Sequence, residues 1–205
     1  DFEASIGAHA FYIAKRQEMR QRHAKYEQTP YALEPNCKES PGGLRDLQML
    51  LWVARAAGFG KNWDELCRNG LLTPLEAQHL KHNEALLSLI RARLHVASRR
   101  REDRLVFDLQ QATAEMFGYS NQPSQRASEQ LMKRYYWSAK AVTQLNQILL
   151  LNISERLHPQ DHELRPINER FYEKAGLIEV ASDQLYFEHP HAILETFYLY
   201  QTEHA

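Results

Sequence analysis

The sequence predicts a mainly α-helical protein: a helical bundle with a short N-terminal extended segment and a small β-hairpin annex near the C-terminus. Three observations carry this prediction. Apolar residues recur at helical spacing over most of the 205 residues. Helix start and stop signals separate these stretches. Short alternations of apolar and polar residues occur only after residue 160.

Composition places the chain among ordinary globular proteins. Hydrophobic residues make up 43% and charged residues 25%, and the net charge is -1, so no overall field draws the protein to nucleic acid or to a membrane. The two cysteines, Cys37 and Cys67, give neither a disulfide framework nor a zinc pattern, which fits a reducing, cytoplasmic location. The longest apolar runs are far shorter than the roughly 20 residues of a membrane span.

The first helix is expected over residues 2–26. Its apolar stripe is predicted to be Phe2, Ile6, Ala10, Ile13 and Ala14. An extended segment, residues 31–39, follows, and Pro-Gly and Gly-Gly pairs place a turn at residues 40–43.

Five further helices are predicted, and N-cap residues and glycines mark where they begin and end. Asn62 and Thr73 are N-cap candidates, each with a Glu three residues on, and Gly58 and Gly118 are stop signals. The predicted helices cover residues 44–57, 62–68, 73–100, 108–117 and 125–157. Their expected buried stripes are Leu80, Leu87, Ile90, Leu94 and Ala97 in the third of these helices, and Leu131, Tyr135, Val142, Leu145 and Leu149 in the last.

The β annex is expected after residue 160. Residues 167–172 and 177–180 alternate apolar and polar side chains around a turn at residues 174–176, which predicts a hairpin. Residues 185–187 are expected to add a strand, and Pro190 to open a final helix.

Residues 34–45 combine groups that suit a phosphate-bearing ligand or a metal. Glu34 offers a carboxylate, Lys38 an ammonium, and the turn at residues 40–43 leads into a helix N-terminus, where amides and the helix dipole favour anions. A carboxylate can also hold a hard cation such as Mg²⁺. The alternative is a plain junction between an extended segment and a helix, because short motifs are weak evidence on their own.

The same stretch carries a family resemblance. Leu33-Glu34-Pro35 together with residues 38–46, Lys-Glu-Ser-Pro-Gly-Gly-Leu-Arg-Asp, closely resembles a segment characteristic of bifunctional PII uridylyltransferase/uridylyl-removing enzymes. Further matching stretches run in order along essentially all 205 residues, among them residues 103–108, 132–136 and 145–147.

The resemblance implies a function and a domain layout. Enzymes of this family transfer UMP from UTP to a tyrosine of the PII signal protein with Mg²⁺, remove it hydrolytically in another domain, and respond to glutamine through further domains. It implies that residues 1–42 end a nucleotidyltransferase domain, that residues 43–160 form the helical bundle, and that residues 161–205 lead to a downstream domain. It also implies Glu34 as a third catalytic carboxylate, with nucleotide contacts from Lys38, Ser40, Gly42, Gly43 and Arg45.

Two features lead us to expect a section of a larger enzyme that is inactive alone. No Gly-Ser turn followed by an Asp-x-Asp pair is present to hold a metal-bound triphosphate, and no His-Asp doublet marks a phosphohydrolase. The alternative is a non-catalytic helical module that docks PII or relays signals between domains.

Other candidate groups have structural explanations. The arginines between residues 91 and 104 are expected to form a solvated helix end. The alternative is an electrostatic contact to nucleotide phosphates or to a neighbouring domain, and no motif or exposed aromatic pattern favours nucleic acid. His95 is expected to be a hydrogen-bonded core residue, and His79 and His82 need further ligands to hold a metal. The tryptophans, including Trp52, Trp63 and Trp137, are expected to pack, as are Tyr135 and Tyr136.

Overall fold

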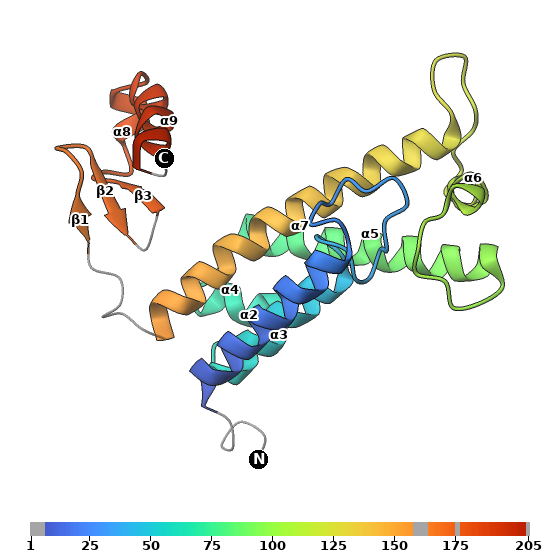
Figure 1. Cartoon of the computed structure of the whole chain (residues 1–205), viewed down its shortest axis with the longest axis horizontal. Helices are drawn as coiled ribbons and strands as arrows, with labels where there is room; N and C mark the ends of the chain where they lie inside the picture. The colour runs from blue at the N-terminus through green and yellow to red at the C-terminus, as the bar shows by residue number, and fades with distance from the viewer. Residues whose placement is uncertain (1–6, 158–163, 175–176, 204–205) are drawn as a thin grey trace. The chain divides into compact units, whose positions relative to one another are not determined.

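The computed structural model describes residues 7–157, 164–174 and 177–203. The chain divides into two compact units, residues 1–157 and 158–205, and both are visible in Figure 1. The first unit is entirely helical apart from its connections, and the second holds a three-stranded sheet and two helices. The predicted mainly α fold with a small β annex is confirmed. None of the described helices is long and apolar enough to cross a membrane.

The first unit is built around its longest helix. Helix α7 contacts α3, α5 and α6, while α2 packs on α3 and α4 packs on α5 (Figure 1). At 1.5 Å per residue the 31 residues of α7 span about 46 Å. The helices are α2 (Ala8–Lys25), α3 (Leu44–Ala56), α4 (Trp63–Arg68), α5 (Pro74–Ser98), α6 (Phe107–Met116) and α7 (Ala127–Leu157).

The capping signals in the sequence end or begin these helices as expected. Thr73 accepts from the backbone of Glu76, and Glu76 reaches back to the Thr73 backbone, so α5 begins with a complete capping box. Asn62 Oδ1 accepts from Glu65 N at 2.9 Å at the start of α4. Helix α3 ends just before Gly58, whose φ of 73° is the left-handed conformation that favours glycine.

The core of the first unit uses most of the predicted stripes. Leu80, Leu87, Ile90 and Leu94 of α5 are fully buried, but Ala97 is only half-buried near the helix end. In α7 the buried residues include Leu131, Tyr135, Val142 and Leu149. Leu145 is half-buried at the margin of the core.

The predicted stripe of the first helix is wrong in its described part. Ile13 is 50% exposed, and Ala10 and Ala14 are exposed as well. Tyr12 is buried instead, and its hydroxyl donates to the Leu150 backbone oxygen at 3.1 Å. The larger aromatic side chain removes more apolar area from water than an alanine does, so it determines which face turns inward. Phe2 and Ile6 lie outside the described residues.

The segment expected to be extended contains no strand. Residues 31–39 form turns and bends with a single bridge, between Asn36 and Arg104. Cys37 N donates to Asp103 O at 2.8 Å and Leu105 N donates to Pro35 O at 2.9 Å, so the segment pairs briefly with the connection between α5 and α6. Its backbone groups find partners without a sheet. The boundary expected between residues 42 and 43 falls inside the first unit.

The second unit holds an antiparallel sheet in the order β1-β2-β3, formed by β1 (Arg165–Pro166), β2 (Phe171–Lys174) and β3 (Leu177–Val180). The hairpin is confirmed with a later start, because Asn168 Oδ1 accepts from Arg170 N and Phe171 N and forms a turn there. Residues 175–176 of the predicted turn lie outside the described residues.

The strand expected at residues 185–187 is wrong. These residues belong to the short helix α8 (Leu185–Glu188), in which Glu188 N donates to Gln184 O at 3.0 Å. The final helix, α9 (Ala192–Glu203), begins two residues after Pro190. Phe171, Leu185, Ala192 and Leu199 form a separate small core, so burial of Leu185 on a helix replaces the expected strand pairing.

Candidate functional site

Glu34, the residue predicted to be catalytic, lies beside the start of α6. Its Oε1 accepts from the backbone N–H of Phe107 at 2.9 Å, and its Oε2 lies 3.4 Å from Nη2 of Arg104. Its backbone oxygen accepts from Nε of the same arginine at 3.1 Å. Phe107 is the first residue of α6, whose N-cap residue makes no side-chain hydrogen bond. Glu34 therefore satisfies a free amide of α6 from a distant part of the chain.

The structure brings together only some of the predicted site residues. Glu34 and Ser40 line a small hollow of about 140 Å³, together with Lys25 and Arg104 among others. Lys38 and Arg45 lie around a different carboxylate: Lys38 Nζ and Arg45 Nη2 are each 3.3 Å from Glu39 Oε1.

The turn at residues 40–43 is buried against the longest helix. Ser40 Oγ accepts from Asn36 N at 2.9 Å, which closes the turn internally. Gly42 has φ of 76°, and a Cβ at this position would overlap the backbone oxygen of Ala139 in α7. Glycine is therefore required at Gly42 both by its backbone conformation and by this close approach.

The amides at the start of α3 all have partners inside the protein. Gly42 N donates to Asp46 Oδ2 at 2.8 Å. The anion site expected at this helix N-terminus is therefore occupied by the chain's own carboxylate. The predicted contacts of the Gly42 and Gly43 amides to phosphate lose their physical basis. The next three amides donate to backbone oxygens: Gly43 to Ser40, Leu44 to Cys37, and Arg45 to Lys38.

Asp46 is the centre of a buried polar network that the sequence reasoning missed. Its side chain is fully buried, with Arg22 Nη2 at 2.5 Å and His23 Nε2 at 2.9 and 3.0 Å from its two oxygens. Arg22 and His23 stand in the last turn of α2, and Asp46 stands in the first turn of α3. One sequence signal could have predicted this network. The predicted helices place basic residues at the end of one helix and an acidic residue at the start of the next, as the helix dipoles favour.

A second network holds the connection between α5 and α6. Asp103 Oδ1 lies 2.6 Å from Arg91 Nε and 2.9 Å from His95 Nε2. Burial alone would raise the pKa of the Asp103 carboxyl, but hydrogen bonds from Arg91 and then His95 hold it below its ordinary value. His95 is hydrogen-bonded as expected, although it is partly exposed and not a full core residue.

Cys37 is not a nucleophile. Its thiol is fully buried, and burial, followed by the nearby charge of Asp103, raises the pKa of Cys37 to about 12. The reactive form of cysteine is the thiolate, so this side chain stays neutral and inert near pH 7. Its role is to pack in the core beside the turn at residues 40–43.

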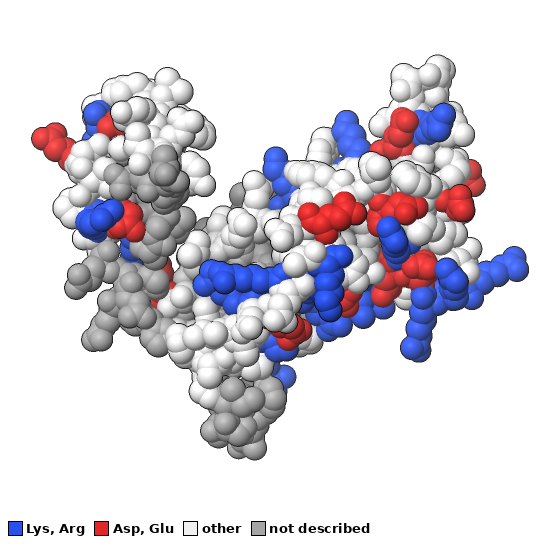
Figure 2. Space-filling model, viewed as in Figure 1, with Lys and Arg blue, Asp and Glu red and all other residues white. Residues whose placement is uncertain are grey.

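The arginines between residues 91 and 104 are largely engaged with the protein. The Arg93 guanidinium lies 3.8 Å from the centre of the Phe117 ring, and Arg100 Nη2 lies 2.8 Å from Glu102 Oε2. Figure 2 shows acidic side chains beside basic ones at the end of the first unit that carries α6. This mixture fits a solvated helix end better than a continuous basic track for nucleic acid.

The described residues do not fit a magnesium site on their own. Within residues 7–157, 164–174 and 177–203, no three His, Cys, Asp or Glu side chains gather where they could hold a metal. Glu34 is already bound to Arg104 and to the α6 amide. A hard cation needs several oxygen ligands, and Glu34 alone does not supply them.

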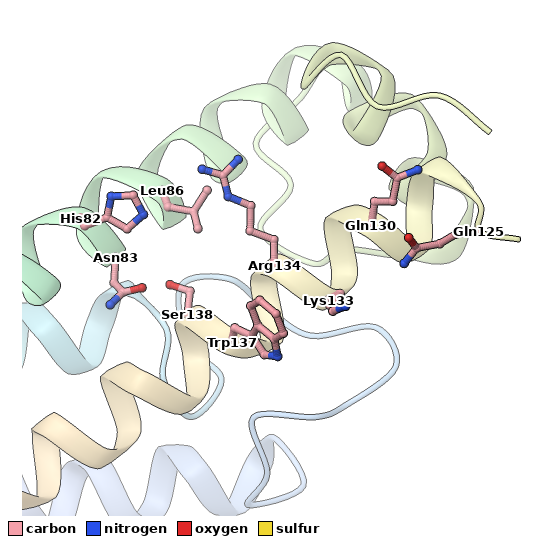
Figure 3. A pocket seen from close by; sticks show the side chains of 9 residues that line it. All are labelled: His82, Asn83, Leu86, Gln125, Gln130, Lys133, Arg134, Trp137 and Ser138. Carbon is pink, nitrogen blue, oxygen red and sulfur yellow. The ribbon is translucent and has the colours of Figure 1, made fainter. Parts of the chain in front are cut away.

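The tryptophans were expected to pack in the core. This is confirmed for Trp63 and wrong for Trp137. Trp63 is 4% exposed and donates through Nε1 to Glu84 at 2.7 Å. Trp137 is 67% exposed and lines a cavity of about 520 Å³ between α5 and α7 (Figure 3). Trp137 lies two residues after the buried Tyr135, roughly 200° around the helix, so the spacing of the α7 stripe already placed it on the outer face.

Comparison with known proteins places the chain in a family. The family model described as GlnD PII-uridylyltransferase matches residues 10–150. A bifunctional uridylyltransferase/uridylyl-removing enzyme of Cupriavidus pinatubonensis is 62% identical over 97% of this chain and 23% of its own length. Enzymes with the same name from Ralstonia nicotianae and Burkholderia vietnamiensis are 58% and 56% identical, each over 98% of this chain. No solved structure matches. The chain spans about a quarter of the length of these relatives.

Proposed function

This chain belongs to the GlnD PII-uridylyltransferase family, and from that membership we propose that it is the central section of an enzyme that transfers UMP from UTP to a tyrosine of PII. The supporting observation is the identity of 62% over 97% of the chain with a bifunctional uridylyltransferase/uridylyl-removing enzyme. The proposal includes Mg²⁺, which would neutralise the triphosphate during transfer. It also includes hydrolytic removal of UMP and control by glutamine through other parts of the enzyme, in the cytoplasm.

Within this enzyme we assign the described residues a positioning role. Described carboxylates do not gather into a metal-binding group, and transfer from a metal-bound triphosphate depends on fixing it accurately. The Asp46 network and the Gly42 contact fix residues 34–46 against α2 and α7. We propose that this rigid attachment holds the upstream nucleotidyltransferase section in place.

Glu34 fits the same role. Both of its carboxylate oxygens bind groups at the start of α6, namely Phe107 N and Arg104. A general base must lie within hydrogen-bond reach of the proton that it takes, whereas the two Glu34 oxygens are directed at groups of the protein itself. We therefore propose that Glu34 positions the loop at residues 31–39, in place of the catalytic role expected from the motif.

Transfer of label from UTP to PII by the full-length protein tests the proposed function. With UTP labelled at its α-phosphate, label should appear on wild-type PII and not on PII whose acceptor tyrosine is replaced by phenylalanine. Equal labelling of both PII proteins, or none of either, would refute the proposal.

The second candidate is a scaffold or docking module for PII or for signals between domains. The observation that favours it is the long helix α7, which contacts α3, α5 and α6 and so couples three elements. Binding of PII to the 205-residue chain, measured without UTP, separates docking from a scaffold role.

A further inference from the structure

The cavity between α5 and α7 has the features of a built ligand site. Its volume of about 520 Å³ lies within the usual range for small-molecule pockets. Figure 3 shows side chains of α5 and α7 around it, together with Gln125 from the connection just before α7. It was not among the sites predicted from the motif at residues 34–45, and none of the residues of that motif lines it.

The charged groups at this cavity are cationic. Lys133 and Arg134 line it, and none of its lining residues carries a carboxylate. Both side chains are exposed, and Arg134 Nη1 lies 3.2 Å from the hydroxyl of Tyr119, which is a neutral partner. Such a lining favours an anionic ligand group, and a guanidinium suits a phosphate or carboxylate.

Trp137 gives the cavity a flat apolar wall. It is 67% exposed, and the Lys133 ammonium lies 5.0 Å from its ring centre. An adjoining hollow of about 440 Å³ is also lined by Trp137 and Lys133, so the indole stands between two open spaces. An exposed indole in this position offers a face on which a planar ring can stack.

Ser138 supplies an independent indication of a ligand. Its side chain is 3% exposed, and within the described part of the chain its Oγ has no hydrogen-bond partner. Ser138 lines the cavity, and Figure 3 shows its hydroxyl oxygen directed toward α5. A buried hydroxyl without a partner costs free energy, which a ligand group bonded to it would recover.

Asn83 faces the same space from α5. Its Nδ2 donates to His79 O at 2.8 Å, and Figure 3 shows its amide oxygen on the side toward Ser138. An acceptor and a hydroxyl side by side can bond the edge of a heterocycle, which carries both donors and acceptors.

We propose that this cavity binds a nucleoside monophosphate or a close analogue, that is, a small organic anion with a planar heterocycle. The phosphate pairs with Arg134 and Lys133, the ring stacks on Trp137, and the ring edge bonds Ser138 and Asn83. The proposal rests on the cavity's own residues and does not depend on the proposed transfer of UMP.

Titration calorimetry on the 205-residue chain, with AMP and UMP as probes, tests the proposal. Uridine and adenosine supply the ring without the charge, and ribose 5-phosphate supplies the charge without the ring. We expect one site per chain for at least one monophosphate, and affinity at least about tenfold weaker for either part alone, as expected when one stack or one ion pair is lost.

Matched variants locate the binding. Trp137→Ala and Arg134→Gln should each weaken monophosphate binding about tenfold or more. Trp52→Ala is the control, because Trp52 also lies beside two cations, Lys15 and Arg45, but does not line this cavity. It should leave affinity within about twofold.

Ser138→Ala separates a ligand role from a packing role. Removal of an unpartnered hydroxyl should leave the melting temperature unchanged or higher, while monophosphate affinity falls several-fold. Far-UV circular dichroism of each variant checks folding, and the same titration on the full-length protein should lose one class of sites in Trp137→Ala.

Three results would overturn the proposal. The first is no saturable binding of any monophosphate to either protein. The second is binding that Trp137→Ala and Arg134→Gln leave unchanged. The third is binding of an acidic tyrosine-containing peptide at Trp137 without any nucleotide binding, which would make the cavity a protein-docking site. Each result is independent of whether the full-length protein labels PII.

Discussion

Gly42 donates its backbone N–H to the carboxylate of Asp46, 2.8 Å away and four residues further along the chain. The same carboxylate binds Arg22 and His23 from α2. One fully buried side chain therefore joins the end of α2, the turn at residues 40–43 and the start of α3. This is the junction on which the proposed positioning role depends.

Asp46→Asn should strongly destabilise the protein. The amide keeps an acceptor for Gly42 N, but the guanidinium of Arg22, whose side chain is 9% exposed, loses its nearer charged partner and keeps only Glu39, 3.9 Å away. Removing one member of a buried ion pair costs about 3–5 kcal/mol. Urea denaturation gives the free energy of unfolding directly.

Asp64→Asn is the control for that measurement. Asp64 pairs with Lys81 at 2.5 Å, but the two side chains are 67% and 48% exposed. An exposed pair contributes about 0–1 kcal/mol. Equal losses for the two variants would show that the Asp46 network does not stabilise the junction.

Gly42→Ala should cost clearly more than Gly58→Ala. Both glycines have a left-handed φ, 76° and 73°, so both substitutions carry similar backbone strain. A Cβ at Gly42 also overlaps the Ala139 backbone, whereas a Cβ at Gly58 meets nothing within 4 Å. We expect about 1 kcal/mol for Gly58→Ala and at least about 2 kcal/mol more for Gly42→Ala. Thermal or urea unfolding of the two variants measures the difference in their stability. Similar losses of stability would mean that the backbone of α7 does not approach the turn closely enough to exclude a Cβ.

Glu34→Gln in the full-length enzyme distinguishes a positioning role from a catalytic one. The amide oxygen still accepts from Phe107 N, so we expect UMP transfer within about fivefold of wild type and unchanged UMP removal. Glu34→Ala removes the acceptor from the α6 N-terminus and should cost about 1 kcal/mol of stability. A fall in transfer of about 10²–10⁴ for Glu34→Gln, with unchanged melting, would restore the catalytic role instead.

Asp103 should make the protein acid-sensitive. Because the folded state holds the pKa of this carboxyl below its ordinary value, its contribution to stability is present above the unfolded pKa and is lost as pH falls through the folded one. The loss therefore begins below about pH 4. The free energy of unfolding, measured from pH 7 to pH 3, should fall less steeply for Asp103→Asn than for wild type. If the free energy of unfolding fell with pH equally for Asp103→Asn and wild type, Asp103 would not be the source of the acid sensitivity.

The helices of the first unit were predictable because their signals are local. Thr73, Pro74 and Glu76 lie within four residues and start α5 without help from the rest of the chain. Helical spacing of Leu80, Leu87 and Ile90 likewise gives the buried face directly.

Long-range partners explain what the sequence did not predict. Tyr12 buries its ring in the core, where its hydroxyl donates to the backbone oxygen of Leu150, 138 residues away. The segment at residues 31–39 looked extended, but its partners at residues 103–107 fold it into turns. The turn at residues 40–43 looked like an anion site, and Asp46 fills that site from within the same motif. The cavity beside Trp137 depends on how α5 and α7 pack, which no local pattern records.

The most direct test of the account compares the full-length enzyme and the 205-residue chain in one assay, with UTP labelled at its α-phosphate, Mg²⁺ and PII. We predict label on PII with the full-length enzyme and none above background with the 205-residue chain, because the described carboxylates of the chain do not gather into a metal-binding group. Circular dichroism confirms that the chain is folded under the assay conditions. Labelling of PII by the folded chain alone, or no labelling by the full-length enzyme, would contradict the central claim.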